Sequence, residues 1–181
     1  GDGYKRQAVY NILYAKFASG LFDDPLPDTL NWKNYIHTPV SVEVARKLAD
    51  ESIVLLENKN NMLPLSSARY SSIAVIGPNA DQVQFGDYSW SSNNADGVTP
   101  LQGMKDYLGE KVKLTYAKGC DLYSQDRSRF KEALKAAKKS DVTIIFVGSQ
   151  SALLARSSEP ATSGEGYDLS DMKLPGVQQE L

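Results

Sequence analysis

Cysteine and histidine are almost absent from this chain of 181 residues, which contains one of each. Because Cys120 has no second cysteine to pair with, no disulfide can form within the chain and no cysteine cluster can hold a metal ion. His37 is equally isolated, which excludes any motif that needs two histidines, and no convincing serine elbow accompanies it. We therefore interpret His37 as a linker or surface residue.

Two further absences exclude classes of partner. The formal net charge is −2, so the chain has no excess of positive charge to attract nucleic acid. No apolar run approaches the roughly 20 residues that a membrane-spanning helix needs. The chain begins at Gly1 without a secretory leader pattern, so we expect that a leader was removed or that the chain is a piece of something longer.

What the sequence does contain is the composition and periodicity of a globular α/β protein. Hydrophobic residues make up 41% and charged residues 23% of the chain, which are ordinary values for a folded domain. Helical spacing and short β-branched runs predict alternating elements. Helices are expected at 4–18, at 41–58 with Ser41 as its cap, at 101–108 and at about 126–139 with Asp126 as its cap, and strands at 73–76, 112–116 and 142–147.

This order of elements predicts an α/β fold with a mostly parallel sheet. Three strands alone leave an apolar strand edge exposed, which natural proteins avoid. We therefore expect a partial α/β sandwich that is incomplete at the C-terminus, completed by further residues or by a partner chain. The first helix has no sheet of its own, and we assign it to a neighbouring domain.

The long loop after the last predicted strand is the most informative segment. It places Glu165 between Gly164 and Gly166, and glycines allow backbone angles that hold a side chain out toward a ligand. A loop of about twenty residues in a compact domain is usually functional or disordered. It also follows the carboxyl end of a sheet strand, where open α/β folds bind ligands.

The order of landmarks along the chain resembles glycoside hydrolase family 3. Residues 8–22 are similar to the end of the family's N-terminal barrel domain, and residues 45–65 to the entry into its second domain. Residues 73–81 resemble the first strand and loop of that domain, residues 141–148 a later strand, and the Glu165 segment the acid/base loop. Each match is weak by itself, but five in the right order indicate the family.

The resemblance implies a domain plan and an activity. Residues 1–24 would be the terminal helix of a (β/α) barrel, residues 25–40 a linker, and residues 41–181 the N-terminal part of the α/β sandwich. Family members are retaining hydrolases whose barrel carries the nucleophile, so we expect this chain to need a barrel domain or partner chain and to be inactive alone. The expected reaction removes terminal β-D-glucosyl residues from a small oligosaccharide or β-glycoside without a cofactor, with β-xylosidase as the close alternative. Family members are often secreted or periplasmic, but the sequence does not give a compartment.

The resemblance also suggests roles for particular residues. Glu165 would be the general acid/base, a role that needs a carboxyl group about 5–5.5 Å from the nucleophile across the scissile bond. Glu159 in the same loop is the second choice, and Tyr167 is placed to shield the carboxyl group. Trp90 and Tyr88 lie in a polar loop and are candidates for stacking on a sugar ring. The plainer interpretations are a solvated loop glutamate and an aromatic ring folded back over the domain.

Two functions outside hydrolysis compete with this interpretation. One is a non-catalytic α/β module that binds a sugar or a nucleotide at the strand ends. The other is an interaction domain whose sheet is completed by another polypeptide.

Overall fold

The computed structural model describes residues 1–91, 93–151 and 162–181. The chain divides into two compact units, Gly1–Lys59 and Asn60–Leu181. No helix in the described ranges combines the length and the apolar character needed to cross a membrane. The predicted assignment of the first 24 residues to a barrel domain is not tested by this division and stays a prediction.

The first unit consists of two helices, α1 (Asp2–Ala18) and α2 (Pro39–Ser52), with a short 3₁₀ helix, η1 (Trp32–Asn34), between them. The prediction that Ser41 caps α2 is wrong: the Thr38 hydroxyl accepts the Ser41 backbone N–H at 3.2 Å, and a proline follows as the first helical residue. The predicted end near Asn58 is also wrong, because the chain becomes extended directly after α2.

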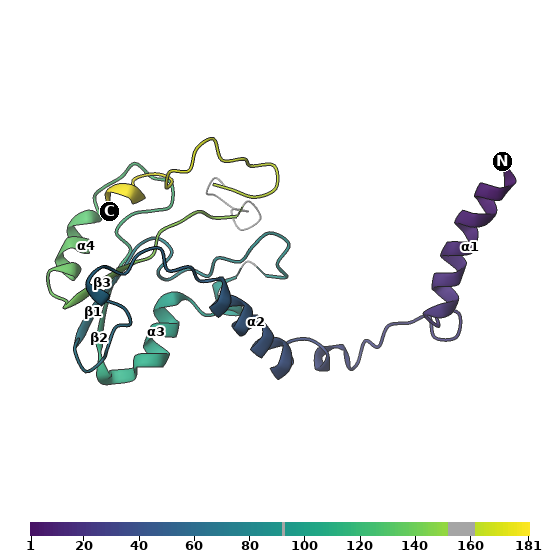
Figure 1. Ribbon diagram of the computed structural model, residues 1–181, viewed down its shortest axis with the longest axis horizontal. Helices are drawn as coiled ribbons and strands as arrows, with labels where there is room; N and C mark the ends of the chain where they lie inside the picture. The colour runs from purple at the N-terminus through teal and green to yellow at the C-terminus, as the bar shows by residue number, and fades with distance from the viewer. Residues whose placement is uncertain (92, 152–161) are drawn as a thin grey trace. The chain divides into compact units, whose positions relative to one another are not determined.

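The second unit holds the sheet, and 3₁₀ helix η2 (Lys59–Asn61) lies where the two units divide. Its remaining elements are β1 (Ser72–Ile76), η3 (Asn94–Asp96), α3 (Pro100–Leu108), η4 (Gly109–Lys111), β2 (Lys113–Ala117), α4 (Phe130–Ala137), β3 (Val142–Ile145) and η5 (Gln178–Glu180). The three strands are parallel and lie in the order β2-β1-β3, with β1 in the centre (Figure 1). The predicted partial α/β fold with an open parallel sheet is confirmed.

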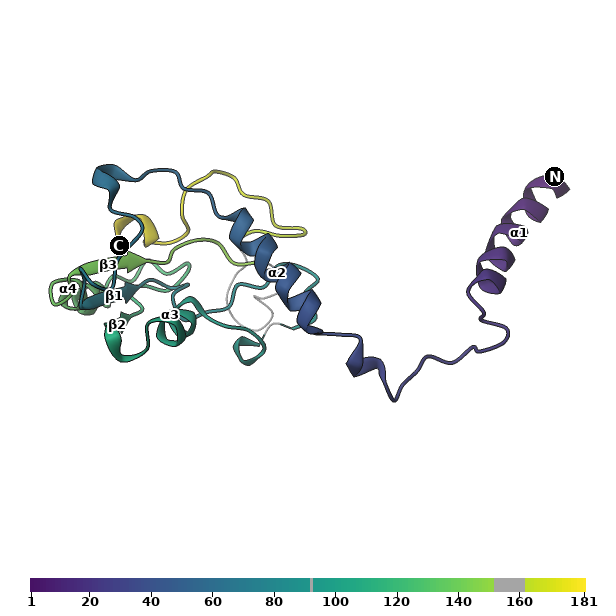
Figure 2. The same ribbon diagram turned by 60° about the horizontal axis from the view of Figure 1, so that its bottom comes forward.

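Alternate residues of β1 build two cores on opposite faces of the sheet, because successive side chains of a strand point to opposite sides. Ile73 and Val75 pack with Leu101 of α3, while Ala74 and Ile76 pack with Ala133 and its neighbours on α4. Helices α3 and α4 therefore cover opposite faces (Figure 2). Small alanines on the α4 face allow that helix to approach the sheet closely.

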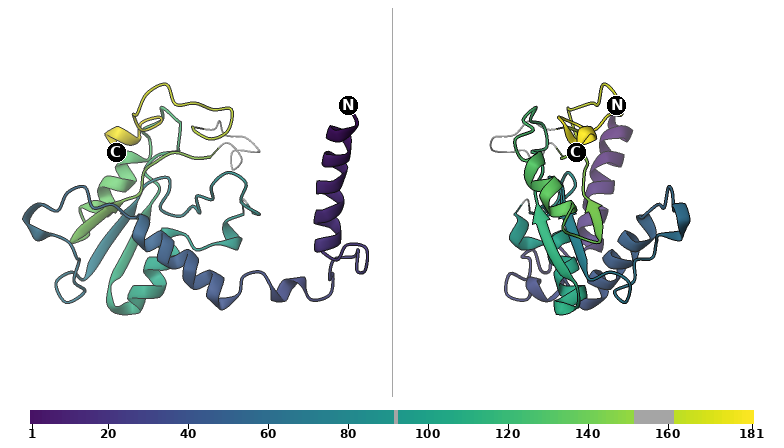
Figure 3. Two further views of the ribbon diagram at one scale, coloured as in Figure 1. Left: turned by 45° about the vertical axis from the view of Figure 1, so that its right-hand side comes forward. Right: turned by 90° about the vertical axis from the view of Figure 1, so that its left-hand side faces the viewer.

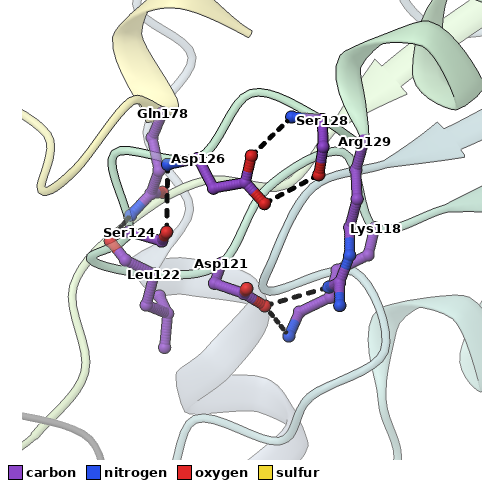
Figure 4. Close-up of polar contacts among 8 residues, drawn as sticks. All are labelled: Lys118, Asp121, Leu122, Ser124, Asp126, Ser128, Arg129 and Gln178. Carbon is purple, nitrogen blue, oxygen red and sulfur yellow. Dashed lines mark hydrogen bonds and ion pairs between the residues drawn. The ribbon is translucent and has the colours of Figure 1, made fainter.

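Helix α4 begins later than predicted. The Asp126 carboxylate does not cap it but accepts the backbone N–H and the hydroxyl of Ser128 at 2.8 and 2.7 Å, and Arg129 takes the cap position (Figure 4). Asp126 thus closes a local turn before the helix. Nearby, Asp121 contacts both Lys118 and Arg129, which holds the segment between β2 and α4 together (Figure 4).

The C-terminal segment returns to the sheet, and its last residue packs against the core on the α4 face (Figure 3). Gln178 is only 3% exposed, and its side-chain amide nitrogen donates to the backbone oxygens of Leu122 at 2.9 Å and Gly148 at 3.0 Å. Its amide oxygen accepts the Gly148 N–H at 2.8 Å. One buried side chain therefore joins the end of the chain to the segments that follow β2 and β3.

Candidate active site

The order of the strands places a topological switch point between β1 and β3. The chain leaves β1 for β2 on one side and then returns past β1 to β3 on the other side. In parallel α/β sheets, ligands bind outside the carboxyl ends of the strands at such a switch point. The loop after β1 and the segment after β3 stay together there, since the Asn79 N–H donates to the Phe146 oxygen at 3.3 Å.

The Glu165 segment runs alongside the extension of β3. Ser163 forms a parallel bridge with Ser151, and the Thr162 N–H donates to the Gln150 oxygen at 3.2 Å. The Gln150 N–H in turn donates to the Thr162 hydroxyl at 2.6 Å. These bonds fix the approach to Glu165, while the buried Gln178 described above fixes the chain beyond it.

The two glycines beside Glu165 have the backbone angles that the sequence predicts. Gly164 has a φ of 113° and Gly166 a φ of 76°, both in a region that residues with a Cβ atom resist. The Tyr167 N–H closes a turn by donating to the Gly164 oxygen at 3.0 Å. Glu165 therefore lies at an exposed tight turn at the carboxyl edge of the sheet.

Asp87, in the loop after β1, contacts two of these segments. One oxygen of its carboxylate accepts the backbone N–H of Glu165 at 2.9 Å, and the other accepts the hydroxyl of Ser151. Asp87 is half-buried, whereas Glu165 is exposed. A single carboxylate thus connects the loop after β1, the extension of β3 and the turn that carries Glu165.

Tyr88 contacts the side-chain carboxylate of the same glutamate. Its hydroxyl donates to the Glu165 carboxylate, and this hydrogen bond is the main reason that the pKa of Tyr88 is raised above its ordinary value. Partial desolvation and the nearby Asp87 charge raise the pKa further. Tyr88 therefore stays a protonated donor at neutral and mildly alkaline pH. Its φ is +63°, an uncommon conformation for a residue with a side chain that often marks a functional site.

The aromatic candidates are all accessible to a ligand. Trp90 is 70% exposed, Tyr88 is 74% exposed and Tyr167 is 54% exposed. For Trp90, both the stacking role and a ring folded back over the domain stay predictions, as does a binding role for the two tyrosines. Glu159, the second choice for the acid/base, lies outside the described residues.

The described ranges contain no cluster of three histidine, cysteine, aspartate or glutamate side chains placed to hold a metal ion. The group at this edge of the sheet that can react is the exposed carboxylate of Glu165. Its carboxylate accepts the Tyr88 hydroxyl, and its backbone N–H donates to the Asp87 carboxylate. Such a group can exchange a proton with a molecule bound in front of it.

Comparison with known proteins identifies the family. Residues 53–181 match the family profile described as the glycosyl hydrolase family 3 C-terminal domain. The chain belongs to glycoside hydrolase family 3. Relatives at 30% identity or more match almost the whole chain, so the similarity extends to residues that precede the profile.

Two curated relatives of the chain are named after different sugars. A beta-xylosidase of Formosa agariphila is 40% identical over 98% of this chain and 24% of its own length. A periplasmic beta-glucosidase of Salmonella typhimurium is 31% identical over 96% of this chain and 25% of its own length. The chain therefore spans about a quarter of the length of the relatives that it matches.

Solved structures support the same family and fold. The β-glucosidase EmGH1 from Erythrobacter marinus superimposes with a TM-score of 0.82 at 30% identity, covering 99% of this chain and 26% of that one. A second neighbour is XlnD, a family 3 exo-β-xylosidase solved in complex with a xylobiose aziridine activity-based probe. It superimposes with a TM-score of 0.65 at 30% identity, covering 91% of this chain and 20% of that one.

Sequence reasoning missed two residues of this family 3 chain that make long-range hydrogen bonds in this region, namely Asp87 and Gln178. A signal for Asp87 was present: it lies in a loop after the central strand, and the carboxyl ends of adjacent parallel strands bring their loops together. Gln178 gave no such signal, because its burial depends on how the end of the chain packs.

Proposed function

We propose that Glu165 is the general acid/base of a retaining exo-β-glycosidase, in which these residues act together with a family 3 barrel domain that carries the nucleophile. The observation that carries this proposal is that hydrogen bonds hold Glu165 at two points, at the switch point of the sheet. The Tyr88 hydroxyl contacts its carboxylate, and Asp87 accepts its backbone N–H. A carboxylate held in this way is presented to a ligand rather than left to move freely.

The proposed reaction takes two steps. In the first, the nucleophilic carboxylate attacks the anomeric carbon, the glycosidic bond breaks, and Glu165 gives its proton to the departing oxygen. In the second, Glu165 takes a proton from water as the water oxygen attacks the anomeric carbon and releases the nucleophile. The configuration at the anomeric carbon is retained because it is inverted twice.

Tyr88 has a defined part in this cycle. Its hydroxyl donates a hydrogen bond to one oxygen of the Glu165 carboxylate, which suits the step in which Glu165 carries no proton. When Glu165 carries the proton, the tyrosine hydroxyl is free to rotate and accept or release its bond. Tyr88 thus keeps the carboxylate in one orientation between the two steps.

We propose a terminal, non-reducing β-D-glucosyl residue as the sugar, in agreement with the sequence interpretation and with the β-glucosidase relatives. A β-xylosyl residue is the second candidate, and the 40% identity with the Formosa agariphila beta-xylosidase favours it. The two sugars differ by one hydroxymethyl group. Hydrolysis of 4-nitrophenyl β-D-glucoside and 4-nitrophenyl β-D-xyloside by the full-length enzyme, compared as kcat/KM, decides between them.

The acid/base role is tested by Glu165→Ala in the full-length enzyme. General acid–base catalysis contributes about 10²–10⁴-fold, so hydrolysis of alkyl glycosides, which are poor leaving groups, is expected to fall by at least about a hundredfold. Activated aryl glycosides, which need no proton, should lose much less in their first step. Azide should restore turnover of the activated substrates and yield the β-glycosyl azide, because azide attacks the glycosyl-enzyme without help from a base.

Glu110→Ala is the matched control, because it removes an exposed glutamate far from the site in sequence, in η4. It should leave both the leaving-group dependence and the response to azide unchanged. If Glu165→Ala loses the same factor with every leaving group and azide restores nothing, the proposal is wrong. Calorimetric affinity of the 181-residue chain alone for glucose or a nucleotide would then favour a non-catalytic binding module.

A further inference from the structure

We infer that Asp87 is a positioning residue for Glu165, a role that depends on the proposed acid/base function. Asp87 and Tyr88 are neighbours in the chain and hold the same glutamate at two points. The first accepts its backbone N–H at 2.9 Å, and the second donates to its carboxylate. Hydrogen bonds at the backbone and at the carboxylate together fix both the position and the direction of the Glu165 side chain.

The need for an external anchor follows from the backbone of the turn. With Gly164 and Gly166 on either side, the peptide units around Glu165 have many accessible conformations, since glycine populates positive and negative φ about equally. The hydrogen bond from the Glu165 N–H to the Asp87 carboxylate selects one of them. A hydrogen bond to an ionised acceptor is roughly twice as strong as a neutral one.

The second oxygen of Asp87 connects this contact to the extension of β3. It accepts the Ser151 hydroxyl, and Ser151 pairs with Ser163 beside the extension of β3. Asp87 therefore connects residues that are distant in the sequence, since Ser151 lies 64 positions and Glu165 78 positions further along the chain. The contact with Ser151 is partly buried, whereas the contact with the Glu165 N–H is exposed to solvent.

Asp87→Asn tests this role with a nearly isosteric side chain. The amide oxygen can still accept the Glu165 N–H, and the Ser151 hydroxyl can turn to accept from the new NH₂ group, but the acceptor is now neutral, so the bond that holds the turn is weakened. A misplacement of about 1 Å in a catalytic group can cost about a hundredfold in rate. We expect kcat for alkyl glycosides to fall by about ten- to a hundredfold, with KM little changed and with a much smaller loss for activated aryl glycosides.

The experiment measures kcat and KM of the full-length enzyme against a series of glycosides with leaving groups of increasing pKa. Asp96→Asn is the matched control, because Asp96 lies in the same loop and accepts the hydroxyl of Ser91 rather than any group of the Glu165 turn. Ser151→Ala removes the outer contact of Asp87 and should give a smaller loss with the same dependence on the leaving group. This second variant keeps the test informative if Asp87→Asn folds poorly.

The outcomes separate the two proposals. An equal loss for every leaving group, or no loss at all, would overturn the role of Asp87 while Glu165→Ala still showed its expected dependence and azide rescue. If Glu165→Ala fails its own test, the acid/base proposal falls, and hydrogen exchange of the Glu165 amide in the 181-residue chain still reports on the contact. That exchange should be faster in Asp87→Asn than in Asp96→Asn, and equal rates would show that Asp87 does not hold the turn.

Discussion

Replacing the buried Gln178 with alanine should destabilise the second unit strongly. The substitution removes three hydrogen bonds, which join this side chain to backbone groups of Leu122 and Gly148 at 2.8–3.0 Å. At about 1 kcal/mol for each bond, the free energy of unfolding should fall by about 3 kcal/mol, and backbone groups left unsatisfied would add to the loss. A change of 1 kcal/mol shifts the melting temperature of a domain of this size by roughly 4 °C, so a decrease of about 12 °C is expected.

Urea unfolding of the 181-residue chain, followed by circular dichroism, measures this loss. The neighbouring, exposed Gln179 supplies the control, since Gln179→Ala removes an amide of the same size and should change stability by less than about 0.5 kcal/mol. Hydrogen exchange gives a local check, because the Gly148 amide should lose its protection only in the Gln178 variant. A loss below about 1 kcal/mol together with unchanged exchange at Gly148 would refute the reasoning.

Two further predictions concern the sheet. Gly77→Ala should lower the free energy of unfolding by at least about 2 kcal/mol in the same urea assay, because Gly77 has a φ of 118° and an added Cβ atom would lie 2.1 Å from the Phe146 backbone oxygen. Gly86→Ala is the control and should be nearly neutral, since nothing lies within 4 Å of a Cβ atom added there. Equal losses for the two variants would contradict this account. The pKa of Asp141 is lowered by hydrogen bonds from the segment at the start of β1, so its stabilising effect is present above pH 4 and is lost as pH falls through the lowered pKa. Asp141→Asn should therefore lower stability at pH 7 and flatten the decline of stability below pH 4, and an unchanged acid limb would count against it.

Much of the fold could be predicted because the buried strands carry their own signal. The run from Ile73 to Ile76 is apolar throughout, as expected of a central parallel strand with both faces covered, and the observed β1 differs from the prediction by one residue. Helix ends were harder, because several residues compete for each cap. Thr38, which precedes a proline, caps α2 in place of Ser41. Asp126 does not cap α4, because its carboxylate closes a turn with Ser128.

The candidate site was predicted in part for a related physical reason. The glycines around Glu165 act locally, so their backbone angles follow from the sequence. The contacts of Asp87 with Ser151 and Glu165 join residues far apart in the chain and depend on which strand lies beside which. Sequence periodicity indicates that the strands are parallel but not that their order is β2-β1-β3. The pairing of β1 with β3 in this order is what brings the loops after these two strands together.

The linkage of two loops through one aspartate has a consequence for protein engineering. A designer who transplants the Glu165 loop into another α/β scaffold would move the carboxylate but leave its anchor behind, because that anchor belongs to the loop after β1. Such a graft would deliver a glutamate without a fixed direction. Swapping both loops as a pair, on neighbouring strands in the same order, is the smallest exchange that keeps the geometry intact.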